Sequence, residues 1–197
     1  VYAYLVKTRC IDREVVSYFA KAKLLYESCE RSKDGAKEYH NAVFVGVDET
    51  GTARHAHKRG LYTEGIGFKG NVDGSDPRYS FHWLGKSDDL YVFEAPVDML
   101  SYITLYPKNW QRHSYVALCG VGCQAMLWML EQCPQISHVS LCLDNDEAGY
   151  KASERLKNQL AEKGYASERR ISQRKDWNDD LVCMMQQKQG GFEMRMA

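Results

Sequence analysis

The sequence predicts an α/β protein in which a parallel sheet flanked by helices follows a small α+β subdomain. Apolar segments typical of strands alternate with segments of helical periodicity throughout the second half. The first half lacks this alternation, and a polar break at Lys86, Ser87 and Asp88 separates the two patterns. With 197 residues, of which 44% are hydrophobic, the chain is long enough to fold around a packed core.

The first unit is expected to span residues 1–86 and to contain a helix and an antiparallel sheet. Asp12 is a plausible N-cap for a helical pattern with apolar side chains on or near one face, at Val15, Val16, Phe19 and Leu24. Short extended segments are expected at residues 42–47, 52–57, 65–70 and 79–84. The turn Asp-Glu-Thr-Gly at residues 48–51 joins the first two as a hairpin.

The second unit is expected to span residues 87–197, with a helix in its C-terminal tail. Its predicted strands are residues 90–93, 115–118, 139–143 and 165–171. Its predicted helices are residues 96–105, 123–132 and 147–163, and Gly164 ends the last of these. Because ligands of parallel sheets bind at the carboxyl ends of strands, that edge is where a functional site is expected.

Acidic side chains follow two of these strands. Glu94 comes directly after the first strand, and Asp98 lies in the first turn of the next helix. Asp144 and Asp146 follow the third strand, and residues two apart in an extended segment point to the same side. Four carboxylates at one crevice repel each other unless a cation neutralises them. Oxygen ligands favour Mg²⁺ or Mn²⁺, and Mg²⁺ commonly also binds phosphate oxygens, so the cluster predicts a phosphate-bearing substrate.

This arrangement of acids resembles the Toprim pattern, which bacterial primases, topoisomerases and some nucleases share. The resemblance covers about residues 88–181, and its most specific piece is Cys-Leu-Asp-Asn-Asp-Glu-Ala-Gly at 142–149. The other matching segments are Leu-Tyr-Val-Phe-Glu-Ala-Pro-Val-Asp at 90–98 and Ala-Leu-Cys-Gly-Val-Gly at 117–122. One departure is Ala95, where the family often has glycine. Pro96 suits a first helical turn, so we expect the fold to survive the change.

Two further resemblances point to primases among the Toprim proteins. The segment Lys-Asp-Trp-Asn-Asp at 175–179 resembles the motif that follows Toprim in bacterial and phage primases, which implies phosphate binding by Lys175 and a further metal ligand at Asp176. Residues 41–60 resemble a hairpin of the small subdomain that precedes Toprim in the primase catalytic core. The nearest likeness is to primase-like proteins of plasmids and conjugative elements.

The resemblance implies Mg²⁺-dependent nucleotidyl transfer on nucleic acid, as in primer synthesis, with Glu94, Asp144 and Asp146 as catalytic residues. The implied partners are DNA or RNA, nucleoside triphosphates, and a helicase or another replication protein. Two alternatives stay open: a metal-dependent Toprim nuclease, and a catalytically weak nucleic-acid-binding module of a mobile element. A topoisomerase is unsupported, because the chain is too short for its gate and cleavage domains.

Basic residues are the candidate contacts to nucleic acid. Lys+Arg and Asp+Glu balance at 26 each, so any such contact must come from a local patch. The candidates in the first half are Arg54, Lys58, Arg59 and Lys69. They are equally consistent with phosphate contacts and with a solvated sheet edge.

Other features indicate the cellular setting. There is no secretory signal, and the most apolar run, residues 116–130, is too short to span a bilayer. Seven cysteines without a CxxC motif favour free thiols, and we expect a cytoplasmic protein that does not bind membranes. His55 and His57 are expected on an exposed strand face. Because the chain begins with Val1, we also expect a fragment of a longer protein.

Overall fold

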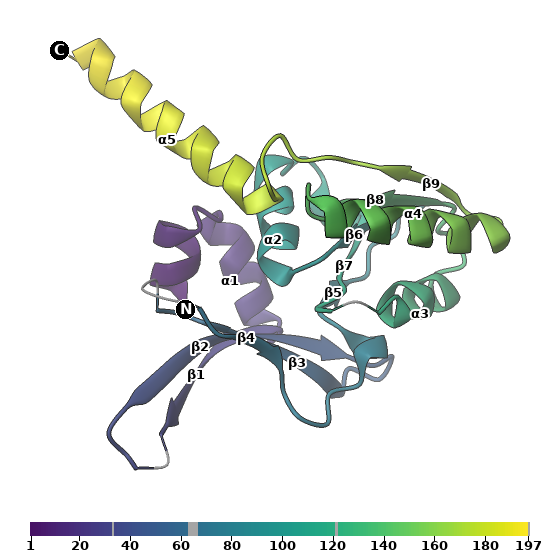
Figure 1. Ribbon diagram of the computed structural model, residues 1–197, viewed down its shortest axis with the longest axis horizontal. Coiled ribbons are helices and arrows are strands. Elements are labelled where there is room, and N and C mark those ends of the chain that lie inside the picture. The colour runs from purple at the N-terminus through teal and green to yellow at the C-terminus, as the bar shows by residue number, and fades with distance from the viewer. Residues whose placement is uncertain (33, 63–66, 121, 197) are drawn as a thin grey trace.

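A computed structural model describes residues 1–32, 34–62, 67–120 and 122–196, with side chains to residue 188. It contains two sheets that meet near the middle of the molecule (Figure 1). Sheet A is antiparallel with strand order β1-β2-β3-β4. Its strands are β1 (Leu25–Arg31), β2 (Glu38–Val47), β3 (Ala53–Gly60) and β4 (Lys69–Asn71).

Sheet B has the order β5-β7-β6-β8-β9, in which β6, β7, β8 and β9 are parallel and β5 is antiparallel to β7. Its strands are β5 (His82–Trp83), β6 (Asp89–Phe93), β7 (Ser114–Ala117), β8 (His138–Leu141) and β9 (Ala166–Arg169). The α-helices are α1 (Arg13–Lys21), α2 (Pro96–Leu105), α3 (Gln124–Gln132), α4 (Glu147–Glu162) and α5 (Trp177–Met196). The predicted class, a parallel sheet flanked by helices after a smaller α+β part, is confirmed.

One hydrophobic core joins the two halves. Buried residues of α1 and β2 pack in the same cluster as buried residues of β6, β7 and α2. The Phe81 ring lies 5.2 Å from Phe19 and 5.3 Å from Phe44, measured between ring centroids. A second cluster covers the other face of sheet B, where β6, β7 and β8 pack on α3 and α4. Sheet B is therefore buried on both faces, as a parallel sheet requires.

The connections of sheet B create a crevice at the ends of β6 and β8. The chain leaves β6 toward its neighbour β7 on one side, then crosses back to β8 on the other side. The helices after β6 and β8 accordingly lie on opposite faces of the sheet: α2 packs in the first core and α4 in the second. Such a change of direction leaves space outside the carboxyl ends of the two strands. This space is the usual ligand position in open α/β sheets.

Most predicted elements of the second half are confirmed with small shifts. Helix α2 has the predicted bounds, and Gly164 follows α4 with a positive φ of 82°. The first half differs more. Helix α1 ends at Lys21, so Leu24 lies beyond it, and the prediction omits β1 entirely. Strand β1 is mostly exposed and has little apolar alternation; pairing with β2 along its length defines it as a strand.

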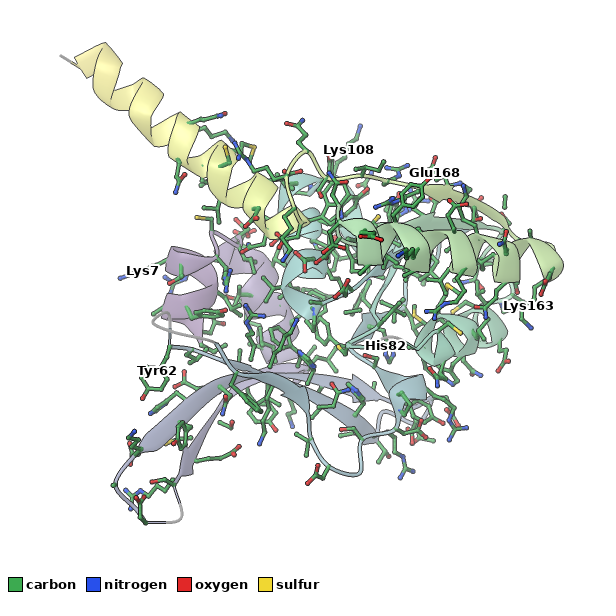
Figure 2. The ribbon with its side chains drawn as sticks, viewed as in Figure 1. Lys7, Tyr62, His82, Lys108, Lys163 and Glu168 are labelled. Atoms are coloured by element: carbon green, nitrogen blue, oxygen red, sulfur yellow. The ribbon has the colours of Figure 1, made fainter. Side chains whose placement is uncertain are left out.

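The extended segment predicted at residues 79–84 is only partly a strand. Pro77–Tyr79 forms a 3₁₀ turn, and β5 pairs with β7 of sheet B and not with sheet A. Figure 2 shows His82 of this strand near the centre of the molecule, and it is 5% exposed. Of the segment predicted at residues 65–70, residues 65 and 66 lie outside the described part, and β4 begins at Lys69.

Helix α5 packs on the body only at its start and then extends away from it (Figure 1). Leu181 is fully buried, and Met184 and Met185 pack against the first core. Within the described part of the chain, no helix combines the length and apolarity that crossing a membrane requires.

Candidate metal centre

Glu94 and Asp144 lie at the carboxyl ends of the adjacent strands β6 and β8. The pairing of these strands holds the two positions together, with the Cys142 amide donating to the Val92 carbonyl at 2.7 Å. The neighbouring strand β7 contributes the turn at Cys119, whose amide donates to the Glu94 carbonyl at 3.0 Å. The backbone of three parallel strands thus orients the Glu94 loop.

The carboxylates in this crevice raise one another's proton affinity. The pKa of Asp144 is raised to about 7 by partial burial and by the negative charges of Glu94, Asp176 and Asp146, while Lys175 acts in the opposite direction. The pKa of Asp98 lies well above its ordinary value because of burial and the charges of Asp176, Asp144 and Glu94. All five predicted acids therefore lie close enough to interact electrostatically.

The five acids have different surroundings. Asp98 is 7% exposed, and its Oδ1 accepts a hydrogen bond from the Asn178 amide at 3.2 Å. Asp146 is exposed and caps α4 by accepting from the Gly149 amide at 2.9 Å. Asp176 caps α5 in the same way, accepting from the Asp179 amide at 2.7 Å. Asp98 thus connects α2 to the start of α5, whereas Asp146 and Asp176 each have one oxygen engaged in a helix cap.

Hydrogen bonds from neighbouring residues hold the loops that carry these acids. The indole of Trp177 donates to the Cys142 carbonyl at 2.9 Å, and the Asn178 amide group donates to the Arg9 carbonyl at 2.8 Å. The Asn145 amide donates to the Lys175 carbonyl at 2.6 Å, which joins the Asp-x-Asp loop to the Lys-Asp loop. Arg169 donates to the Asp144 carbonyl at 3.1 Å. Trp177 and Asn178 belong to the predicted motif at residues 175–179.

Two of the predicted basic residues reach the acid crevice. A cavity of about 240 Å³ is lined by Arg59 and Lys69 of sheet A and by Glu94 and Ala95 of sheet B. The two basic residues are direct partners in the β3–β4 pairing, and neither forms an ion pair with any other described residue. Ala95 has extended backbone angles, φ −128° and ψ 154°, so alanine fits here without strain.

The other two basic residues of this group lie away from that cavity. Lys58 forms an ion pair with Glu30 of β1, and Arg54 forms one with Asp48 at 2.7 Å. Side chains alternate along β3, so Arg54 and Lys58 lie on one side of the sheet and Arg59 on the other, with its β4 partner Lys69. Arg54 and Lys58 therefore lie in ion pairs on β3, which is an inner strand of sheet A and not a sheet edge.

His55 and His57 are buried, at 3% and 8% exposure, so the expected exposed strand face is wrong. They share a side of β3 with Arg59, the side that faces the body of the protein. His57 contacts Asn71 Oδ1 at 2.7 Å and lines the Glu94 cavity. Burial lowers the pKa of both rings, that of His55 to about 4, so both are neutral at pH 7.

The donor set fits a hard divalent cation. Every candidate ligand in the crevice is a carboxylate, and the mutual repulsion that raises the pKa of Asp144 is what a bound cation would relieve. Among the described residues, three potential ligand atoms lie within 4.8 Å of one another only at Cys29, Glu38 and His40. The described crevice acids are thus spaced more widely, and Mg²⁺, which usually takes one or two protein carboxylates and keeps waters, is compatible with that spacing.

Gly149 provides a test of the Asp144 position. A Cβ atom at residue 149 would lie 2.0 Å from the Asp144 carbonyl oxygen, so Gly149→Ala must displace the Asp-x-Asp loop. We expect it to lower the free energy of unfolding by about 2 kcal/mol and to weaken Mn²⁺ binding. Gly67→Ala is the control, because a Cβ there meets no atom of the described residues within 4 Å. Equal unfolding midpoints for the two variants in urea would contradict this packing.

The raised pKa of Asp144 predicts a pH-dependent stability. A carboxyl whose pKa rises from 3.8 to about 7 on folding favours the folded state below pH 4, and this contribution is lost as pH rises through 7. Metal-free Asp144→Asn should therefore melt about 5 °C above the wild type at pH 8 and close to it at pH 4. The exposed Asp88→Asn variant should show no such difference. Parallel melting curves for wild type and Asp144→Asn from pH 4 to 8 would disprove the electrostatic coupling.

Comparisons with known proteins agree with this fold. Residues 91–181 match the Toprim-like family, and residues 3–87 match a family described as a protein of unknown function, DUF3991. Residues 91–181 thus resemble a Toprim-like domain, and the fold of the chain is similar to that of primase catalytic cores.

Three proteins illustrate what the chain is similar to. The uncharacterized protein pXO2-78 of Bacillus anthracis is 27% identical over 98% of this chain, which spans 60% of that protein. The primase fragment of the bacteriophage T7 primase-helicase protein is similar in structure, with a TM-score of 0.61 and 19% identity over 88% of this chain and 66% of that one. The Escherichia coli primase catalytic core has a TM-score of 0.57 and 13% identity over 91% of this chain and 67% of that one.

Proposed function

We propose that this protein is a metal-dependent nucleotidyltransferase that joins nucleotides on a nucleic-acid template, as primases do. The observation that carries the proposal is the cavity in which Arg59 and Lys69 of sheet A lie across from Glu94 of sheet B. Cationic side chains beside a carboxylate cluster suit a triphosphate whose oxygens contact both the cations and a bound metal.

Mg²⁺ or Mn²⁺ bound by Glu94, Asp144 and Asp146, with Asp176 near a second ion, would orient phosphate oxygens and neutralise charge during nucleotidyl transfer. The chain's own residues contribute binding and orientation. Arg59 and Lys69 would bind phosphates, and Lys175 offers another cation close to Asp144. Asp98 is a further candidate ligand; it is buried, its pKa lies well above its ordinary value, and its hydrogen bond from the Asn178 amide positions the start of α5.

Glu94 also borders a second space. A cavity of about 410 Å³ is also lined by Glu94, together with Leu118, Leu143 and Ala152 and the basic residues Lys151 and Arg155. One carboxylate thus borders two cavities, and each has basic side chains at its wall. Joining two nucleotides requires room for two substrates at one reactive group, whereas hydrolysis of one phosphodiester requires a single groove. This favours synthesis over a nuclease activity.

The test is metal-dependent dinucleotide formation. The chain is incubated with single-stranded DNA, the four ribonucleoside triphosphates and Mg²⁺ or Mn²⁺, and the products are separated on a gel. Short products that require template and metal would support the proposal. Cleavage of the DNA without synthesis would replace it with the nuclease alternative. Binding without either reaction would favour the catalytically weak binding module.

The wider setting belongs to the same proposal. We infer that the protein acts in DNA replication of a mobile element, with DNA or RNA as partner and a helicase or other replication protein alongside. Salt-dependent binding to single-stranded DNA is the direct check of the nucleic-acid part, because the chain has no net charge and only a local patch can supply affinity.

A further inference from the structure

A second group of potential metal ligands lies on the β1–β2 hairpin, far along the chain from the acid crevice. Cys29 and His40 are directly paired across the two strands, and Cys29 Sγ lies 3.6 Å from His40 Nε2. Glu38, two residues before His40, points to the same side, with its Oε2 at 3.9 Å from His40 Nε2. The three ligand atoms all lie within 4.8 Å of one another.

Neighbouring side chains orient two of these ligands. His40 Nδ1 lies 2.7 Å from Glu27 Oε1, and an N–H donated there leaves Nε2 as the unprotonated nitrogen that faces the group. Glu38 Oε1 accepts a hydrogen bond from Arg31 Nε at 3.1 Å, which leaves Oε2 toward His40. A carboxylate behind a ligand histidine is the usual outer partner at zinc sites.

We propose that Cys29, Glu38 and His40 bind a zinc-like divalent cation, with Glu27 as the residue that orients His40. Sulfur, imidazole and carboxylate are the three side-chain ligand types that Zn²⁺ accepts. Tetrahedral bonds of about 2.3 Å to sulfur and 2.0 Å to nitrogen place those two atoms roughly 3.5 Å apart, close to the separation seen here. Cys29 loses its thiol proton to solvent on binding, so affinity rises with pH.

This site differs from the acid crevice in the metal that it selects and in the part of the fold that a bound ion would stabilise. Its soft thiolate selects against Mg²⁺, whereas the crevice offers only oxygen ligands. Cys29 and Glu38 are exposed, so an ion held by three side chains keeps its fourth position open to water or to an external ligand. The hairpin projects from the body (Figure 1), and a cation held by both strands would tie the edge strand β1 to β2.

Cobalt spectroscopy on the full chain tests the site. Titration of Co²⁺ into the wild type should produce a thiolate-to-cobalt charge-transfer band that saturates at one equivalent of Co²⁺. One equivalent of Zn²⁺ should then abolish this band. Cys29→Ser should eliminate the band, and Glu27→Gln should weaken Co²⁺ binding about 10- to 100-fold. Cys183→Ser, at a partly buried cysteine on α5, is the matched control and should leave the band unchanged.

Further variants separate this site from the crevice. The Asp144→Asn, Asp146→Asn double variant should retain the band, so the site stands even if the proposed nucleotidyl transfer fails. A band that survives Cys29→Ser, or one that the double variant removes, would overturn the proposal. Should Cys29→Ser fail to fold, His40→Asn serves as the second variant, since it removes the nitrogen ligand on the other strand and should abolish the band as well.

Discussion

Replacing Glu94 with glutamine is expected to lower metal-dependent dinucleotide synthesis by roughly three orders of magnitude. Glu94 is the carboxylate that borders both cavities, and it lies at the end of β6 in the centre of the crevice. Glutamine keeps the shape and removes the charge, so a bound Mg²⁺ loses a ligand and the reacting hydroxyl loses a potential base. The measurement is the initial rate of product formation at saturating triphosphate.

The control for this change is Glu131→Gln, which removes an exposed carboxylate from α3. It should synthesise at the wild-type rate. Both variants should melt within a few degrees of the wild type, which separates lost catalysis from lost folding. Synthesis by Glu94→Gln at more than a tenth of the wild-type rate would exclude Glu94 from the catalytic site.

The paired substitution Arg59→Ala, Lys69→Ala is expected to reduce kcat/KM for the triphosphate by at least about 100-fold. Each side chain would supply a charge-assisted hydrogen bond to phosphate, and such bonds contribute about 1.5–3 kcal/mol each. If the two residues contact the nucleic-acid backbone instead, the slope of log affinity against log salt should fall by about 1.4 for single strands. Steady-state kinetics and fluorescence anisotropy at several salt concentrations distinguish the two roles.

The matched control removes the same charge from the other face of sheet A. Arg54→Ala, Lys58→Ala deletes one arginine and one lysine that already pair with Asp48 and Glu30. This control should change kcat/KM and the salt slope little. Equal losses in the two double variants would mean that only the net charge of sheet A matters and that the cavity beside Glu94 is not a phosphate site.

The sequence by itself determined the class of sheet B and the positions of its acids. Alternating strand and helix patterns predict the parallel sheet, because buried parallel strands are short apolar runs and the intervening helices have their own periodicity. A carboxylate directly after such a strand must lie at the sheet's carboxyl edge, whatever the details of packing. Glu94 and Asp144 could therefore be assigned to one crevice from their places in the chain.

Only the tertiary structure decided which polar residues serve that crevice. Strand β1 carries too little apolar alternation to be identified alone, and only its pairing with β2 makes it a strand. The four basic residues of the first half look equivalent in sequence. The side-chain alternation of β3 and its pairing with β4 bring only two of them, Arg59 and Lys69, to the cavity beside Glu94. The same holds for Cys29 and His40, eleven residues apart, which meet because the hairpin register places them opposite each other. Register and strand pairing depend on long-range contacts, and no local pattern encodes them.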